Sequence, residues 1–152
     1  MDKNGIFGNL FFRLFEKKIK NIYWTDGKLN QEDLIKEAIY KVISDNKLDQ
    51  EPFNLRAIYL FGSLVRNRYK EEIIDIGDID IYVWLKTNQV GTLKETLTFT
   101  QKLQNEFSSR LSFLKKPIQV LIANGSIMEK SISGLTIHNP EKQLYVLYER
   151  KY

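Results

Sequence analysis

Two aspartates, Asp78 and Asp80, stand one residue apart at the head of an apolar segment. Side chains alternate between the two faces of a β-strand, so both carboxylates point to one face, together with Tyr82 and Trp84. Two like charges this close repel each other, and a hard divalent cation relieves the repulsion while both stay ionised. The spacing therefore predicts a Mg²⁺ site on a strand face that is at least partly open.

A Gly-Ser pair, Gly62 and Ser63, precedes the aspartates and follows another apolar segment. Glycine lets the backbone approach a phosphate closely, a helix start presents N–H groups to an anion, and the serine hydroxyl adds a donor. Arg66 and Arg68 could add positive charge, although solvated side chains are the simpler interpretation. Each signal alone is weak, because a Gly-Ser pair is typical of ordinary turns and Asp-x-Asp of solvated strand ends. Their order along the chain is more informative.

The elements that must position these residues follow from the hydrophobic pattern. Apolar spacings of three and four predict helices over residues 30–46 (starting at Asn30), 62–69 and 92–114, with a short one within 126–134. Apolar runs bounded by turn residues predict strands over 55–61, 79–85, 117–123 and 143–149. The alternation predicts an α/β (α+β) fold with a small mixed sheet of about four strands and helices on one face.

A separate amphipathic pattern covers residues 6–24 and predicts a helix. Its apolar positions are Phe7, Leu10, Phe11, Leu14, Phe15, Ile19 and Ile22. Three roles stay open for this helix: docking on the domain, binding a partner, or lying on a membrane surface. We therefore divide the chain into an N-terminal helical extension, residues 1–29, and one domain, residues 30–152.

The order of the motifs resembles the minimal nucleotidyltransferases of the superfamily that includes DNA polymerase beta. In that family a hydrophobic strand ends in Phe-Gly-Ser, here residues 61–63, and an Asp-x-Asp pair follows on the next strand, here residues 78–80. A short helix and a Val-Leu-Tyr-Glu strand often close the domain, and residues 127–134 and 146–149 look like that unit. The resemblance covers about residues 30–149 and implies the nucleotidyltransferase fold.

The resemblance implies a role for each motif residue. Gly62, Ser63 and Arg66 would bind a nucleoside triphosphate, and Asp78 and Asp80 would hold Mg²⁺ as catalytic metal ligands. The family's reaction moves a nucleoside monophosphate, here expected to be AMP, from NTP to a hydroxyl of a protein or small molecule. Small members are often antitoxins that modify or bind a toxin, and the lack of a second domain favours that type over antibiotic-modifying relatives.

One departure from the family pattern concerns the third carboxylate, whose position on the later strand is occupied by Gln119. A glutamine amide offers an oxygen to a metal but no negative charge and no useful base. A two-ion site is therefore in doubt, unless Asp75 or Glu129 takes that place in space. The alternative is a catalytically impaired protein that binds a nucleotide, a partner protein or both, so whether the chain is an enzyme stays open.

Composition narrows the other possibilities. The 152 residues suit one domain, with 43% hydrophobic residues for a core, and the net charge of +4 mildly favours anionic partners without pointing to nucleic acid. The absence of cysteine excludes disulfides and thiolate metal sites and fits the cytoplasm. No signal peptide and no membrane span are expected. His138, the single histidine, is expected in a surface turn.

Overall fold

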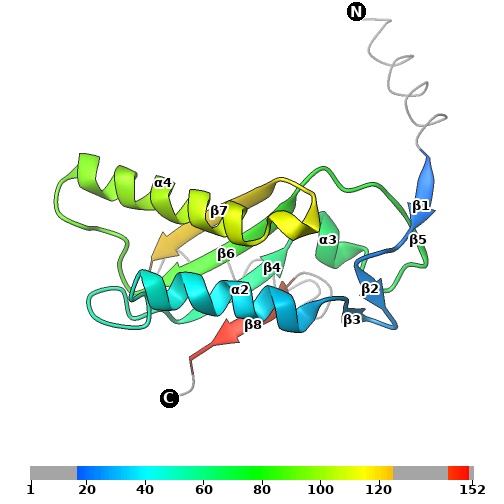
Figure 1. The fold of residues 1–152 in the computed structure, drawn as a ribbon, viewed down its shortest axis with the longest axis horizontal. Coiled ribbons are helices and arrows are strands. Elements are labelled where there is room, and N and C mark those ends of the chain that lie inside the picture. The colour runs from blue at the N-terminus through cyan, green and yellow to red at the C-terminus, as the bar shows by residue number, and fades with distance from the viewer. Residues whose placement is uncertain (1–16, 125–143, 151–152) are drawn as a thin grey trace, which may run out of the picture.

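Four strands form the central sheet in the computed structural model, which describes residues 17–124 and 144–150 (Figure 1). In order across the sheet they are β7 (Ile118–Asn124), β6 (Ile79–Leu85), β4 (Ala57–Phe61) and β8 (Leu144–Glu149). β6 and β7 run parallel, whereas β4 is antiparallel to both β6 and β8. The predicted small α+β fold with a four-stranded mixed sheet is confirmed.

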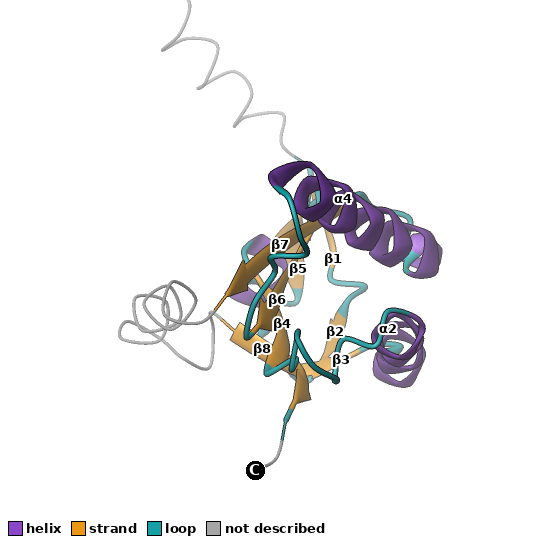
Figure 2. Cartoon of the chain, turned by 90° about the vertical axis from the view of Figure 1, so that its left-hand side faces the viewer, coloured by secondary structure: helices purple, strands orange, loops and turns teal. Residues whose placement is uncertain are grey.

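Two helices cover the same face of this sheet, as Figure 2 shows. They are α2 (Glu32–Asp45) and α4 (Leu93–Arg110), and a 3-10 turn, η1 (Ser112–Leu114), follows α4. α4 belongs to the connection between the parallel strands β6 and β7, which cannot be joined by a tight hairpin. It begins at a capping box in which the Thr92 hydroxyl accepts a hydrogen bond from the Glu95 backbone N–H at 3.2 Å.

The core lies between the helices and the sheet. Every second residue of β6 is buried there, and both helices contribute an apolar stripe, because strand and helix periods place these residues on one face. The buried residues of these three elements are Ile79, Ile81, Val83 and Leu85 on β6, Ile35, Ala38, Ile39, Val42 and Ile43 on α2, and Leu103 and Phe107 on α4.

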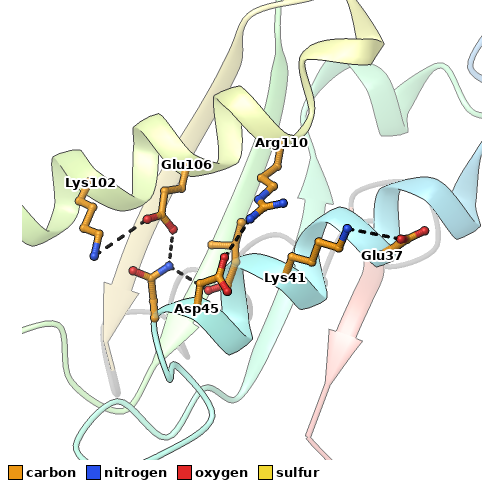
Figure 3. A network of polar contacts seen from close by, with 8 residues as sticks. Glu37, Lys41, Asp45, Lys102, Glu106 and Arg110 are labelled. Atoms are coloured by element: carbon orange, nitrogen blue, oxygen red, sulfur yellow. Dashed lines mark hydrogen bonds and ion pairs between the residues drawn. The ribbon is translucent and has the colours of Figure 1, made fainter.

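Polar contacts join α2 to α4 at the surface (Figure 3). Arg110 Nη2 lies 2.9 Å from Asp45 Oδ2, and the Asn46 amide donates to the Glu106 carboxylate. Exposed ion pairs of this kind stabilise a fold by about 0–1 kcal/mol each. They align the two helices, whereas the apolar layer beneath supplies most of the stability.

Residues 17–29 differ from the sequence-based expectation of a helix over residues 6–24. The chain forms β1 (Lys18–Lys20), which pairs antiparallel with β5 (Glu72–Ile74), and then β2 (Trp24–Thr25), which pairs with β3 (Lys28–Leu29). The helix prediction is therefore wrong over residues 17–24. The rest of that pattern lies outside the described residues, and the division of the chain at residue 29 stays a prediction.

The side chain of Asn21 gives the physical reason for this difference. Asn21 is only 7% exposed, and its amide donates to the carbonyl oxygens of Asn67 at 3.0 Å and Lys70 at 2.8 Å. Its own carbonyl oxygen accepts from the backbone N–H groups of Tyr23 and Trp24. These bonds to residues far along the chain hold residues 21–24 in a turn, so the local helical spacing is overridden.

The other elements begin and end close to their predicted limits. The helix predicted over 62–69 is shorter, α3 (Ser63–Arg66), and Asn30 does not cap α2, because its amide donates to Ile22 O at 2.9 Å. Gln31 stands at the N-cap instead, in a left-handed conformation. The helix predicted within 126–134, with Glu129 and His138, lies outside the described residues. In the described part, no helix is both long and apolar enough to cross a membrane.

Candidate functional site

The Gly-Ser turn lies where β4 ends and α3 begins. Gly62 has φ 77° and ψ −152°, a combination that residues with a side chain rarely adopt. A Cβ placed on Gly62 would collide with the Asp80 carboxylate oxygen Oδ2 and lie 3.3 Å from its Cγ. Glycine is therefore required twice, for the backbone conformation and for the close approach to Asp80.

The two aspartates lie next to this turn. Asp80 is the antiparallel partner of Phe61, the residue before Gly62, and Asp78 directly precedes β6. Both side chains are half-buried, and neither enters the helix-covered core. The structure thus brings Gly62, Ser63, Asp78 and Asp80 to one corner of the sheet, although Ser63 and Asp78 are far apart along the chain.

Electrostatics at this corner act mainly on Asp80. Burial raises the pKa of the Asp80 carboxyl above its ordinary value, the nearby charge of Asp78 raises this pKa further, and Arg66 on α3 lowers it. Arg66 is therefore close enough for its charge to act on the carboxylate. A bound cation would also lower the pKa of Asp80, as Arg66 does, because positive charge favours the ionised carboxylate.

Arg68, the other arginine considered from the sequence, contacts residues that attach the segment 17–29 to the domain. Its Nε donates to Gly27 O at 2.6 Å, and its guanidinium lies 5.3 Å from the Trp24 ring, 5.1 Å from Tyr69 and 5.0 Å from Tyr145. These cation–π contacts place it among residues that fasten the segment 17–29 to the domain. Arg66 is thus the arginine whose charge acts on Asp80.

Gln119 takes the place beside Asp80 on the neighbouring strand. β6 and β7 pair in register, with Asp80 opposite Gln119, and Gln119 is exposed. Asp75 does not compensate for the missing acid, because both of its carboxylate oxygens lie 2.9 Å from Lys116 Nζ. Over residues 17–124 and 144–150, no group of three Asp, Glu, His or Cys side chains is arranged to hold a metal ion.

Aromatic side chains extend the site along the same face of the sheet. The rings of Phe61 and Tyr82 stack with centroids 4.0 Å apart, and the Arg56 guanidinium lies 5.6 Å from the Trp84 ring. Tyr82 and Trp84 pack on Tyr59 and Ala57 of β4. Sequence reasoning missed Tyr59 and Arg56 and used Phe61 only as the first residue of the Phe-Gly-Ser motif. The alternation of faces along β4 is the signal that places Tyr59 and Phe61 on the face of Asp80.

The tyrosines of this face stay protonated well above neutral pH. Burial raises the pKa of Tyr82, with a further contribution from the charge of Asp80, and burial beside Glu149 raises the pKa of Tyr59. They therefore offer neutral rings and hydroxyl groups. A neutral aromatic surface beside carboxylates suits a planar, partly apolar ligand such as a nucleobase.

The donor set fits one hard cation shared with a phosphate ligand. Mg²⁺ is typically held by one or two carboxylates together with phosphate oxygens and water, and Asp78 and Asp80 supply two carboxylates that are close enough for their charges to interact. Gln119 adds at most an amide oxygen, so the acids among the described residues do not make a full second site at this corner.

In sequence, the chain matches no protein-family model and no curated protein. The assignment of chemistry to this corner of the sheet therefore depends on the residues themselves.

Proposed function

We propose that this chain is a Mg²⁺-dependent nucleotidyltransferase. It would move a nucleoside monophosphate, with AMP as the expected one, from NTP to a hydroxyl of a protein or small molecule. The observation that carries the proposal is the packing of Gly62 against Asp80. The Gly-Ser turn, which would bind phosphate, lies in direct contact with Asp80, one of the two carboxylates that would hold Mg²⁺, and a metal–triphosphate complex requires these two groups side by side.

Each residue has a distinct task under this proposal. The Gly62–Ser63 turn binds phosphate oxygens through its N–H groups and the serine hydroxyl, and Arg66 adds charge that stabilises the leaving pyrophosphate. Asp78 and Asp80 would hold Mg²⁺, which supplies charge neutralisation to the triphosphate when bound. The Phe61–Tyr82 stack offers a surface for the base. Catalysis would then be mainly positioning and charge stabilisation.

A second candidate function is supported by Gln119. Because Asp80 and Gln119 are register partners, the position where a third carboxylate would complete a two-ion site carries a neutral amide. A protein that binds Mg²⁺·NTP without transferring the nucleotide, and acts by docking on a partner such as a toxin, is the matching proposal. Fold alone does not choose between an enzyme and a binding protein.

One experiment separates the two functions. The full chain is incubated with Mg²⁺ and each α-labelled NTP, alone and with the product of a neighbouring gene, and label on protein or small molecules is measured. We expect transfer from ATP that falls at least about 100-fold in Asp80→Asn. Asp33→Asn, which removes an exposed carboxylate from α2 on the far side of the sheet, is the matched control and should keep full transfer.

The contrary outcome is equally specific. Wild-type protein that binds Mg²⁺·ATP in calorimetry but transfers no label, together with transfer by Gln119→Asp, would support the binding protein. Absence of ATP binding in wild type, with or without Mg²⁺, would reject both functions.

A further inference from the structure

A cavity lies on the helix-covered side of the sheet, between the first turn of α2 and the segment that follows α4. Its volume is about 310 Å³. Its floor is apolar and deeply buried, and includes Leu60 of β4, Ile79 and Ile81 of β6 and Leu111 after α4. Such a volume lies at the small end of the range of about 300–1,000 Å³ that is usual for ligand pockets.

The rim of the cavity combines exposed apolar side chains with positive charge. Ile22 is 62% exposed and Phe113 38% exposed, and Lys115 and Lys116 lie beside them. Lys116 is engaged by Asp75, but among the residues that the structure describes no carboxylate lies within ion-pair distance of Lys115. The mouth therefore presents, next to apolar surface, an ammonium group that no described carboxylate pairs with.

The backbone at the rim is held in costly conformations. Gln31, which precedes α2, has φ 60°, and Lys115, which follows η1, has φ 57°. Both residues line the cavity. Residues other than glycine adopt this region only where the surroundings fix them. At position 115 a glycine would relieve the strain but would also remove the ammonium group from the mouth.

We propose that this cavity binds a small amphipathic anion, a monocarboxylate whose apolar tail enters the cavity and whose head group pairs with Lys115. Burial of the tail against Leu60, Ile81 and Leu111 removes apolar surface from water, and the head group forms a charge-assisted hydrogen bond. The volume of about 310 Å³ equals that of roughly ten liquid water molecules, which suits a tail of medium length.

This site is separate from the nucleotide site proposed above. Ile79 and Ile81 of the cavity floor alternate along β6 with Asp80 and Tyr82, so the two sites use opposite faces of the same strand. Binding of the carboxylate can therefore be measured without any nucleotide, and its outcome does not depend on the transfer reaction.

Octanoate is the probe for this site. It is titrated into the full-length chain in calorimetry and in methyl NMR, with 1-octanol as the uncharged comparison. We expect saturable binding of octanoate, with the methyl signals of Ile35, Ile81 and Leu111 shifting most, and weaker binding of 1-octanol. No saturable binding of octanoate, or shifts confined to Leu121 and Val146 on the opposite face, would overturn the proposal.

A pair of variants tests the role of the charge. Lys115→Asn removes the ammonium group and keeps a residue that tolerates φ > 0, so the fold is retained. We expect octanoate to bind about threefold to fivefold more weakly, with 1-octanol unchanged. Lys47→Asn is the matched control, because Lys47 is also an exposed lysine with positive φ, 51°, but lies outside the cavity. Equal effects of the two variants would refute a specific head-group contact.

Other occupants give different results in the same experiment. If the ligand-free chain shows NOEs between the Leu111 methyls and the phenylalanines of residues 1–16, the chain's own N-terminal segment fills the cavity and the proposal fails. It fails likewise if these methyl signals depend on protein concentration, because a second copy would then cover the mouth.

Discussion

The two faces of the central sheet differ in what lies on them and in what they do. On one face, Ile79, Ile81, Val83 and Leu85 of β6 are buried beneath α2 and α4. On the other, no helix of the described residues covers Asp80, Tyr82 and Trp84, and Leu121 of β7 is 47% exposed. Because side chains alternate along a strand, one set of β6 residues can stabilise the core while the alternate set is available on the other face to contact a ligand.

This difference explains why charged residues are tolerated in the middle of a sheet. The Asp80 carboxylate avoids the full cost of burial because its side chain points away from the core, and Arg66 partly offsets the remaining cost. Stability and chemistry should then respond separately to substitutions on the two faces. Four predictions test this separation, from the largest expected effect to the smallest.

Truncation of a β6 residue on the covered face should have the largest effect. Ile81→Ala removes a fully buried side chain and leaves a void under the helices, so we expect the free energy of unfolding to fall by about 3–4 kcal/mol in urea denaturation. Leu121→Ala on the exposed face of β7 is the control, with a loss below about 1 kcal/mol. Similar losses in the two variants would mean that the faces do not differ as described.

Substitution of the turn glycine, Gly62, should have an intermediate effect and should lower both the stability of the fold and the binding of a ligand. Gly62→Ala forces a side chain into a left-handed conformation and against Asp80, so we expect stability to fall by about 2 kcal/mol and binding of Mg²⁺·ATP to be lost. Gly77→Ala is the control, because a Cβ there would meet nothing within 4 Å. Unimpaired Mg²⁺·ATP binding by Gly62→Ala would contradict the phosphate-binding role of the turn.

Neutralisation of Asp80 should separate function from stability. The raised pKa means that the folded state favours the protonated carboxyl over the ionised one. The stability that the protonated carboxyl contributes is full below the unfolded pKa and is lost as pH rises through the folded pKa. At neutral pH, Asp80→Asn should therefore unfold at the same urea concentration as wild type or slightly above it. Stabilisation of wild type by Mg²⁺·ATP should disappear in this variant, and a persistent shift would remove Asp80 from the site.

The smallest expected effect is a change in how the free energy of unfolding depends on pH at alkaline pH, and it involves Tyr145 on the side of the sheet that the helices cover. Burial and a hydrogen bond to Glu32 of α2 raise the pKa of Tyr145 to about 12 from its ordinary value of 10.0. The neutral tyrosine thus stabilises the fold fully below pH 10, and this contribution is lost as pH rises toward 12. Tyr145→Phe should flatten the fall in unfolding free energy over that range. An unchanged slope would show that other groups control it.

The parts of the fold that could be predicted are those fixed by local pattern. The strand over residues 79–85 is predicted with its observed limits, because four buried positions alternate with half-buried ones. The placement of Asp80 and Gln119 side by side follows from the register of β6 and β7, which the sequence suggests only through the family resemblance. The predicted site residues are adjacent for that reason.

The parts that could not be predicted depend on contacts between distant residues. Nothing in the spacing of residues 17–24 shows that Asn21 bonds to the carbonyls of Asn67 and Lys70. The strand Glu72–Ile74 is equally invisible, because three residues of mixed polarity become a strand only when Lys18–Lys20 pairs with them. The positive φ of Lys115 carries no sequence signal either, since lysine rarely adopts it.

The order of strands in the sheet also bears on how the chain assembles. β4 and β6 are central and near each other in sequence, whereas β8 returns from the C-terminal end to pair with β4 at the edge. Pairing two strands that lie this far apart in sequence has a high entropic cost, so β8 should join last, after the turn at Gly62 already faces Asp80. In pulsed hydrogen exchange during refolding, the amides of β6 should then become protected before those of β8. In a chain that is still being synthesised, Gly62 and Asp80 would meet before β8 is added to the sheet.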